Sequence, residues 1–337
     1  MIPRLYPLGV PLDLLLPDLL HPGSTLRMPA LERWLARGDA GAIPEGDLLR
    51  VVARAYGLEG PLPVAAVALA GGGFAATGTW LCADPVHLEV MQDAVALRDG
   101  TMLNVTREEA DALLADLERH FSADDFRFMA PAPHRWFVNV PAGEAPVTVA
   151  LPDAEGRNLF GLLPRGTGRV NWPSALTEVQ MLFAGHPVNQ AREARGDLAI
   201  NAVWFWGEGE LPQKVAKPYA VVYSDATFVR GLGTLSDARV LPVPESWAKV
   251  DAVRPDESVL LVLDGPSRAW RRNDVDAWRA EAARLDETWL VPLKDAVERF
   301  ETVTLTLPRR RDALVVRVEP RARWRLFRGV RPLAAHA

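Results

Sequence analysis

The sequence predicts an α/β protein with a small α+β insertion, and three observations lead to this fold class. Short apolar runs at Leu12–Leu16 and Ser258–Leu263 are typical of strands that are buried on both faces of a sheet. Helical segments lie between such runs, as in Pro29–Gly38, which has proline at its start and glycine at its end. Between residues 77 and 165 the order changes to two strands, a helix and two further strands, which indicates a separate α+β segment.

Length, composition and charge bound the class of protein. The 337 residues are enough for one large α/β domain with an insertion, or for two domains, and the apolar fraction of 49% fits a globular protein with a substantial core. A net charge of −5 gives no reason to expect nucleic acid as a partner. Cys82 is the one cysteine of the sequence, so no internal disulfide can form and a reducing compartment is expected.

The N-terminal 20 residues are apolar but interrupted by four prolines, and they lack the basic leader of a signal peptide. No later run is long enough to span a membrane. We therefore expect a cytoplasmic protein with no membrane partner.

Asp47–Gly57 reads as an amphipathic helix, and the apolar run Ala66–Ala70 leads into three glycines that favour a flexible loop. Inside the insertion, Thr106 followed by Glu109 is a capping-box spacing at a helix start. The insertion elements are expected, in chain order, at Thr79–Val90, Ala94–Leu97, Thr106–His120, Phe126–Met129 and Arg135–Val140.

The middle of the chain predicts a helix at Trp172–Ala184, a turn, and then a buried strand at Leu198–Trp206. Trp204 and Trp206 point to the same side of that strand, because side chains alternate along it. Ligands bind at the carboxyl ends of strands in open α/β sheets, so Asn201 and the two tryptophans are candidates for the floor of a site. The alternative is a core strand with no further role.

The last third continues the pattern of strands and helices. A strand is expected at Tyr219–Tyr223 with a helix after it, and a long helix is expected at Asp274–Val297. Three more strands are expected at Thr302–Pro308, Leu314–Pro320 and Trp324–Arg331, the last two as a pair.

One stretch carries a specific resemblance. His186-Pro187-Val188-Asn189, then Arg192, then Asn201–Gly209 is similar to the middle of the archaeal-type, cofactor-independent phosphoglycerate mutases, and in particular to shortened bacterial relatives that lack the metal ligands. The resemblance implies an alkaline-phosphatase-like fold, with a mostly parallel sheet and helices on both faces. It implies a core domain of residues 1–76 and 166–337, with residues 77–165 as the insertion. His186 and Asn189 thereby become ligand-binding candidates.

The residues that carry the family's chemistry are replaced in this sequence. No serine or threonine occurs from Asp47 to Gly60, where the mutases place their nucleophile. At offsets where the family has metal-binding aspartate and histidine, the chain has Ser267 with Arg271 and the pair Arg309-Arg310. Arginine has no lone pair to give a metal, so the resemblance implies loss of the two-metal centre and no cofactor.

Several of these positions keep two interpretations. Asp18 is either the counterpart of the family's first metal-binding aspartate or an ordinary carboxylate at a strand end. Arg271, Arg309 and Arg310 either converge into an anion pocket that replaces the metals or lie solvated on the surface, or one of them pairs with Asp18. Arg230 either clamps a phosphate or carboxylate or caps its own helix.

These observations favour a non-catalytic or regulatory protein, a pseudoenzyme, that binds a small anionic ligand or a protein partner, which includes a second copy of the chain. Arg135 lies where the mutases have a substrate-binding segment and joins the binding candidates. The alternative is a metal-independent enzyme that acts on a phosphorylated small molecule with Asp84, His186 or Cys82 as nucleophile or base.

Overall fold

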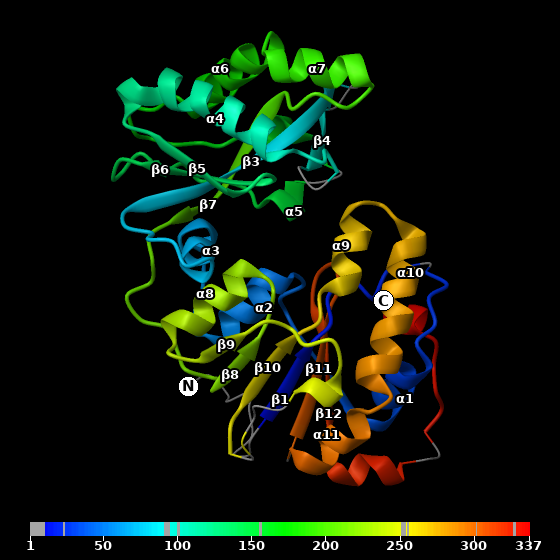
Figure 1. The fold of residues 1–337 in the computed structure, drawn as a ribbon. Helices are drawn as coiled ribbons and strands as arrows, with labels where there is room; N and C mark the ends of the chain where they lie inside the picture. Colours follow the sequence, from blue (N-terminus) through cyan, green and yellow to red (C-terminus); the bar gives the residue numbers. More distant parts are fainter. Residues whose placement is uncertain are drawn as a thin grey trace. The chain divides into compact units, whose positions relative to one another are not determined.

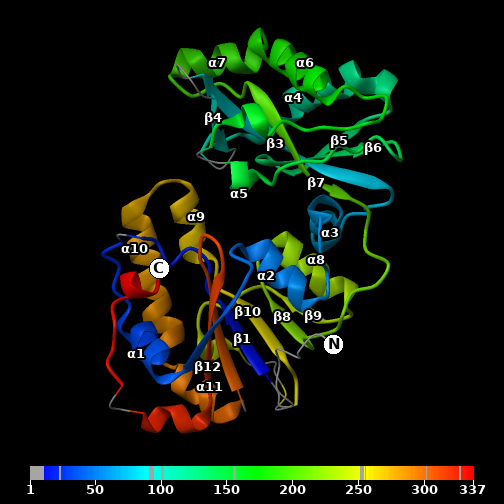
Figure 2. The same ribbon diagram turned by 180° about the vertical axis from the view of Figure 1, so that it is seen from behind.

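The computed structural model describes residues 11–22, 24–90, 95–99, 102–154, 157–250, 254, 256–300, 302–325 and 328–337. The chain groups into two compact units, one formed by residues 1–59 and 214–337 and the other by residues 60–213 (Figures 1 and 2). Residues 60–76 and 166–213, which the sequence placed with the core domain, lie in the second unit.

The first unit is built on a seven-stranded sheet. Its strands β1, β8, β9, β10 and β11 are parallel, and β12 and β2 add antiparallel at one edge. The predicted α/β class with a mostly parallel sheet is therefore confirmed. The strand order is β2 (Asp39–Ile43), β12 (Ala313–Val318), β11 (Thr302–Pro308), β1 (Pro11–Leu15), β10 (Val259–Val262), β8 (Val221–Tyr223) and β9 (Arg239–Leu241).

Helices cover both faces of this sheet, as Figures 1 and 2 show. One face carries α1 (Pro29–Arg37), α10 (Val275–Leu285) and α11 (Leu293–Arg299). The other carries α2 (Leu48–Ala55) and α8 (Thr227–Leu235). The short helix α9 (Gly265–Arg271) follows the carboxyl end of β10.

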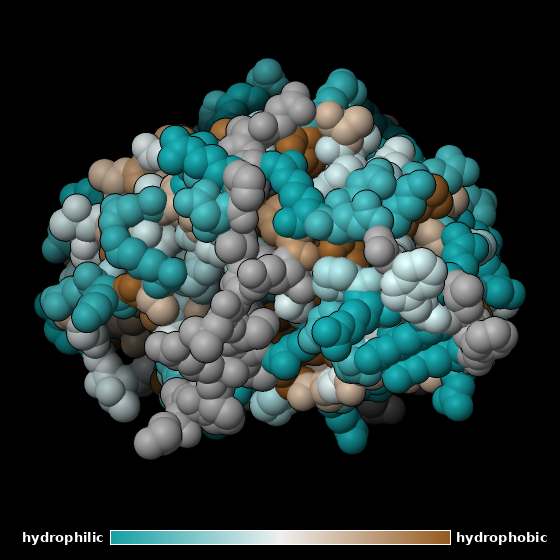
Figure 3. Space-filling model, turned by 90° about the horizontal axis from the view of Figure 1, so that it is seen from below, coloured by the Kyte–Doolittle hydropathy of each residue, from teal (hydrophilic) through white to brown (hydrophobic). Residues whose placement is uncertain are grey.

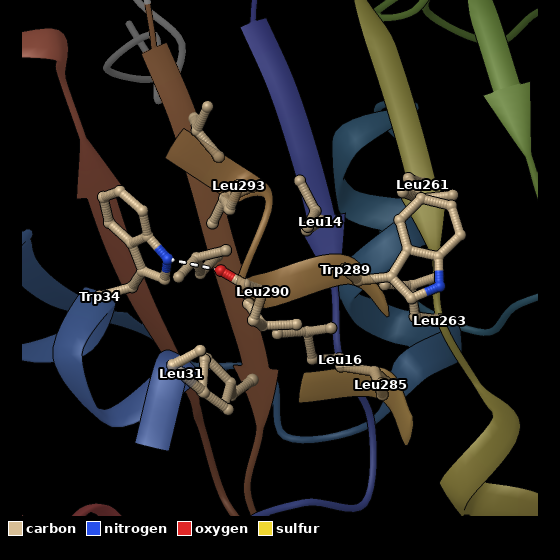
Figure 4. Packing of buried hydrophobic residues seen from close by; sticks show 14 of the residues in the cluster. Leu14, Leu16, Leu31, Trp34, Leu261, Leu263, Leu285, Trp289, Leu290 and Leu293 are labelled. Atoms are coloured by element: carbon tan, nitrogen blue, oxygen red, sulfur yellow. Dashed lines mark hydrogen bonds between the residues drawn. The ribbon is translucent and has the colours of Figure 1, made fainter. Parts of the chain in front are cut away.

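The larger core lies between the sheet and the α1 face (Figure 4). Leu14 of β1 is fully buried there, and a leucine removed from water in this way contributes about 1.5–3 kcal/mol. Trp34 of α1 donates its indole hydrogen to the carbonyl of Leu290 over 2.8 Å, which satisfies the polar group of a buried ring.

The predicted helix at Asp274–Val297 is wrong in its continuity. The α-helix α10 ends at Leu285, a π-helical turn follows at Asp286–Leu290, and α11 starts after Pro292. The carboxylate of Asp286 accepts hydrogen bonds from the backbone nitrogens of Ala30 and Leu31, both at 2.9 Å, and so caps the start of α1. The capping residue Asp286 is thus the first residue of the π-helical turn that interrupts the helix.

The predicted pairing of two C-terminal strands is also wrong. The strand β12 pairs with β11 on one side and with β2 on the other, and Pro320–Trp324 forms a 3-10 helix. β2, which the sequence did not reveal, covers the edge that the second strand was expected to take.

The second unit is a five-stranded antiparallel sheet with helices on both sides (Figure 1). Its strands β3, β4 and β6 agree with the expected insertion strands, and the capping box at Thr106 and Glu109 is present on α4. The elements are α3 (Val64–Gly71), β3 (Thr79–Val90), β4 (Val95–Asp99), α4 (Arg107–His120), β5 (Arg127–Ala132), β6 (Arg135–Val140), α5 (Leu151–Ala154), α6 (Trp172–Ala184), α7 (Pro187–Arg195) and β7 (Ala202–Gly209).

The central strand β7 does not join the parallel sheet. It pairs antiparallel with β3, from Val86 opposite Ala202 to Cys82 opposite Trp206. Two glycines at its end admit α3: a Cβ on Gly207 (φ 66°) would lie 2.8 Å from Val64, so close approach requires glycine there. The expectation that this strand lies in the parallel sheet is thus wrong.

The face of the molecule in Figure 3 is mainly hydrophilic, with hydrophobic residues as small patches between polar ones. In the described part of the chain, no helix is both long and apolar enough to cross a membrane.

Candidate functional site

The carboxyl ends of the neighbouring parallel strands β8 and β10 bring two acidic turns to the same edge of the sheet. β8 ends at Tyr223 and is followed by Ser224-Asp225, and β10 ends at Val262 and is followed by Leu263-Asp264. In parallel sheets this edge is where side chains from successive loops meet. We define the strand-end cluster as Ser224, Asp225, Arg230, Asp264, Ser267, Arg268 and Arg271.

Electrostatics place the acidic and basic members of this cluster within reach of one another. Asp264 is 8% exposed, and its burial raises the pKa of the carboxyl, while the positive charges of Arg268 and Arg271 lower it in part. The negative charge of Asp225 raises the pKa of Asp264 further, as burial does. Two carboxylates and two guanidinium groups therefore share this edge.

Arg230 adds a third positive charge from α8. Its Nη1 lies 3.5 Å from the carbonyl oxygen of Ser224, so the guanidinium is directed back toward the end of β8. The buried Ser224 hydroxyl accepts a hydrogen bond from the backbone nitrogen of Ala226 at 3.1 Å and shapes the turn. With three arginines and two aspartates ionised, the cluster has a net positive charge.

Ser267 contributes a neutral polar group. It is 1% exposed, and its hydroxyl oxygen has no hydrogen-bond partner among the described residues. The Nε of the exposed Arg271 donates to the carbonyl of Ser267 over 3.3 Å, which anchors the arginine along the helix surface. Guanidinium and hydroxyl donors are the groups that bind phosphate and carboxylate.

Asp18 lies in the turn after β1. Its backbone is left-handed, with φ 56°, and its carbonyl accepts a hydrogen bond from the indole of Trp278 at 2.9 Å. The ring of His21 stacks on Trp270 with centroids 3.6 Å apart, and burial lowers the pKa of His21 despite the nearby Asp18 charge. A neutral imidazole in an aromatic stack fixes the turn.

The residues present do not fit a two-metal centre. Within the described ranges, no group of three or more histidine, cysteine, aspartate or glutamate side chains is placed to hold a metal ion. Divalent metals in enzymes need several such donors at once. At the positions where the resemblance to the mutases implies donors, the chain has serine and arginine.

The three arginines at those positions have different surroundings. Arg271 belongs to the strand-end cluster. Arg309 binds the carboxylate of Asp312 and, through Nη1, the carbonyl of His336 at 3.1 Å. Arg310 is exposed at the turn between β11 and β12.

In the second unit, Arg135 and Trp206 meet at the buried carboxylate of Asp84. Arg135 Nη1 lies 2.5 Å from Asp84 Oδ2, and the Trp206 indole donates to the same oxygen over 2.9 Å. The guanidinium also lies over the Trp206 ring, 5.7 Å from its centroid. Burial first, and then the Asp84 charge, raise the pKa of the Cys82 thiol, which disfavours the thiolate that a nucleophile needs.

The other candidates of the second unit hold backbone groups. His186 caps α7 by accepting from the nitrogen of Val188 at 3.1 Å, and Trp204 donates to the carbonyl of Val149 at 2.9 Å. Asn189 and Asn201 each bond backbone nitrogen and carbonyl groups, with partners Phe183, Ile200 and Leu88 at 2.7–2.9 Å.

The predicted candidates did not include Asp225, Asp264 and Arg268 of the strand-end cluster. For Asp264 the sequence did contain a signal, because Asp264-Gly265 ends an apolar run.

No family model matches the chain. It is 21% identical over 234 residues to a protein of Geobacter sulfurreducens described as a probable 2,3-bisphosphoglycerate-independent phosphoglycerate mutase, a match that spans 64% of this chain and 58% of the length of that relative. This relative confirms the sequence resemblance to the cofactor-independent mutases.

Two solved structures are similar. The PH0037 protein from Pyrococcus horikoshii matches with a TM-score of 0.55 and 11% identity, over 92% of this chain and 87% of that one, which shows a likeness of fold. A cofactor-independent phosphoglycerate mutase from Thermoplasma acidophilum matches with a TM-score of 0.47 and 16% identity, over 93% and 90% of the two chains.

Proposed function

We propose that this phosphoglycerate-mutase-like chain has lost two-metal phosphoryl transfer and binds a small anion at the strand-end cluster. The observation that carries the proposal is the position of Arg268 and Arg271 beside Asp264 and the unpartnered hydroxyl of Ser267. A cationic edge with a buried hydroxyl suits a phosphate or carboxylate group.

The same replacements support loss of the reaction. Arginine cannot donate a lone pair to a cation and repels it, so Arg271, Arg309 and Arg310 oppose a metal at the former positions. From Asp47 to Gly60 the chain also lacks a hydroxyl to accept a phosphoryl group. Binding can survive both changes because it needs only the positive charge.

The size of the expected ligand follows from the cluster. Three guanidinium groups and one serine suffice for one or two anionic groups, so we propose a small phosphorylated or carboxylated metabolite. The name of the Geobacter relative makes 3-phosphoglycerate the first probe. Inorganic phosphate and glycerate test which half of that molecule carries the affinity.

Calorimetric titration of the full chain with 3-phosphoglycerate, phosphate and glycerate tests the proposal. Arg271→Gln should weaken binding by about tenfold or more, because a charge-assisted hydrogen bond contributes about 1.5–3 kcal/mol. Arg272→Gln is the matched control, since it removes the same charge one residue further along and should change affinity little. Equal effects of the two variants, or no heat with any probe, contradict the site.

Mutase assays on the same preparations test the loss of activity. We expect no turnover of 3-phosphoglycerate with chelator or with added Mn²⁺. Turnover in chelator supports a metal-independent enzyme instead, and turnover that requires Mn²⁺ means that the two-metal reaction persists.

A further inference from the structure

A row of polar residues crosses the three neighbouring strands β1, β11 and β12 of the first unit. Asp13 of β1 is in register with Thr304 of β11, which is in register with Arg317 of β12. Leu12 and Leu14 point into the core under α1, so Asp13, between them, points to the face that carries α2. Asp13 is 5% exposed, which is unusual for a carboxyl in the middle of a strand.

The face of Asp13 borders a cavity of about 50 Å³ between the sheet and α2. Its walls are mostly apolar, with Asp13, Thr304, Thr306 and Arg317 as polar groups from the sheet and Tyr219 next to them. Helix α2 closes the cavity with Val51, Val52, Arg54 and Ala55.

One oxygen of Asp13 is satisfied and the other is not. The hydroxyl of Tyr219 donates to Oδ2 over 2.7 Å. Oδ1 is buried and has no hydrogen-bond partner among the residues that the structure describes. A buried acceptor is costly unless it receives a hydrogen bond, so a donor in the cavity would remove the penalty.

Two arginines line the cavity together with this carboxyl. The charge of Arg317 lowers the pKa of Asp13, and does so more weakly than the hydroxyls of Tyr219 and Thr304. Arg54, from α2, is engaged with Glu45 at 2.5 Å. Oδ1 of Asp13 can therefore accept a hydrogen bond from a further donor in the cavity.

Volume limits the donor to a few atoms. An apolar cavity of about 150 Å³ accepts benzene, and one water molecule takes up about 30 Å³ of liquid. About 50 Å³ thus has room for one or two water molecules or an ion of similar size.

We propose that the cavity between the sheet and α2 is a binding site for a compact hydrogen-bond donor, water or an ammonium-sized cation, held by Oδ1 of Asp13. The cavity shares no lining residue with the strand-end cluster, and the proposal is independent of the proposed function. Burial raises the pKa of Asp13 to about 6, and a donor at Oδ1 opposes this because it stabilises the ionised form.

A cavity-filling substitution tests whether the site is occupied. Val52→Ile adds one methyl group from α2, which should displace the donor and leave Oδ1 unsatisfied. We expect the melting temperature to fall by about 3 °C or more at pH 8 and by less at pH 5, where the carboxyl is protonated. A rise at both pH values would mean that the cavity is empty, and would overturn the proposal.

Two further measurements keep the proposal testable if that variant folds poorly. A high-resolution crystal structure of the wild-type chain at pH 8 should show density within hydrogen-bond distance of Oδ1, and an empty cavity contradicts the site. Thermal melting in ammonium chloride and in sodium chloride of equal ionic strength distinguishes an ammonium-sized cation from water as the donor. A gain specific to ammonium that Asp13→Asn abolishes identifies the cation. Equal melting excludes the cation, and the density at Oδ1 must then be that of water.

Discussion

Arg309 and Asp312 form two parallel hydrogen bonds, from Nε to Oδ1 at 2.8 Å and from Nη2 to Oδ2 at 2.7 Å. This fork closes the turn between β11 and β12. The resemblance to the mutases implies a metal-ligand position for Arg309, yet its guanidinium holds the hairpin through Asp312. Arg309 therefore has a structural role in the hairpin, whereas Arg271 belongs to the strand-end cluster.

Arg309→Gln should lower the stability of the chain and leave anion binding unchanged. Loss of a bidentate but partly exposed pair is expected to cost about 1 kcal/mol in urea denaturation. Arg310→Gln is the control, because Arg310 is exposed at the same turn. A tenfold loss of phosphate affinity in Arg309→Gln would place Arg309 in the binding site after all.

Addition of Mn²⁺ should not stabilise the chain. A ligand that binds the folded state at 100 times its dissociation constant adds about 2.7 kcal/mol, so a metal site would be seen in thermal melting. We expect unchanged melting between chelator and about 1 mM Mn²⁺, which is about a thousandfold over a dissociation constant of about 1 μM. A reproducible rise would show that donors outside the former positions bind metal.

Removal of Arg135 should destabilise the second unit. Asp84 is 1% exposed, and Arg135→Met removes the guanidinium that lies 2.5 Å from its Oδ2. Breaking a buried pair costs about 3–5 kcal/mol, and partial exposure of Arg135 reduces our expectation to about 2–3 kcal/mol.

The double variant Asp84→Asn/Arg135→Met controls for the buried charge. It should recover most of the loss, because no unpaired carboxylate remains. Denaturation followed by tryptophan fluorescence measures both variants. If the double variant is as unstable as the single one, the cost lies in packing rather than in charge.

Asn189 should be a structural residue. Its amide donates to the carbonyls of Phe183 and Ile200 and accepts from the nitrogen of Ile200, all at 2.8 Å. Asn189→Ala leaves buried backbone groups unpaired, and we expect a loss of about 3 kcal/mol in urea denaturation. Gln190→Ala, at the exposed neighbouring position, should cost little; if it costs as much, the helix rather than the amide is responsible.

Asp13→Asn should change the pH dependence of stability. The folded pKa of about 6 lies above the ordinary value of 3.8, so the contribution of Asp13 is fully present below 3.8 and is lost as pH rises through 6. The two values differ by about 2.2, which corresponds to about 3 kcal/mol. The variant should therefore gain up to about that much relative to wild type between pH 4 and pH 8.

A donor bound at Oδ1 of Asp13 makes this gain smaller, since it stabilises the ionised carboxyl. Urea denaturation at pH 4, 6 and 8 measures the difference. A constant difference between variant and wild type across this range would contradict a raised pKa.

Local signals in the sequence determined most of the elements. The helix at Trp172–Ala184, the strands at Thr79–Val90 and Thr302–Pro308, and the capping box at Thr106 agree with the structure because each depends on residues close together in the chain. The presence of serine and arginine at positions where the resemblance implies metal donors is likewise inferred from the sequence alone.

Tertiary structure decided which elements come together. A buried strand such as β7 has the same composition in either sheet, and only its pairing with β3 placed it in the antiparallel one. Likewise, the carboxylate of Asp286 accepts hydrogen bonds from the backbone nitrogens of Ala30 and Leu31, which lie far from it in the sequence. The physical reason is that hydrogen bonds and charges act over a few ångströms in space, and residues distant in sequence reach that range only in the folded chain.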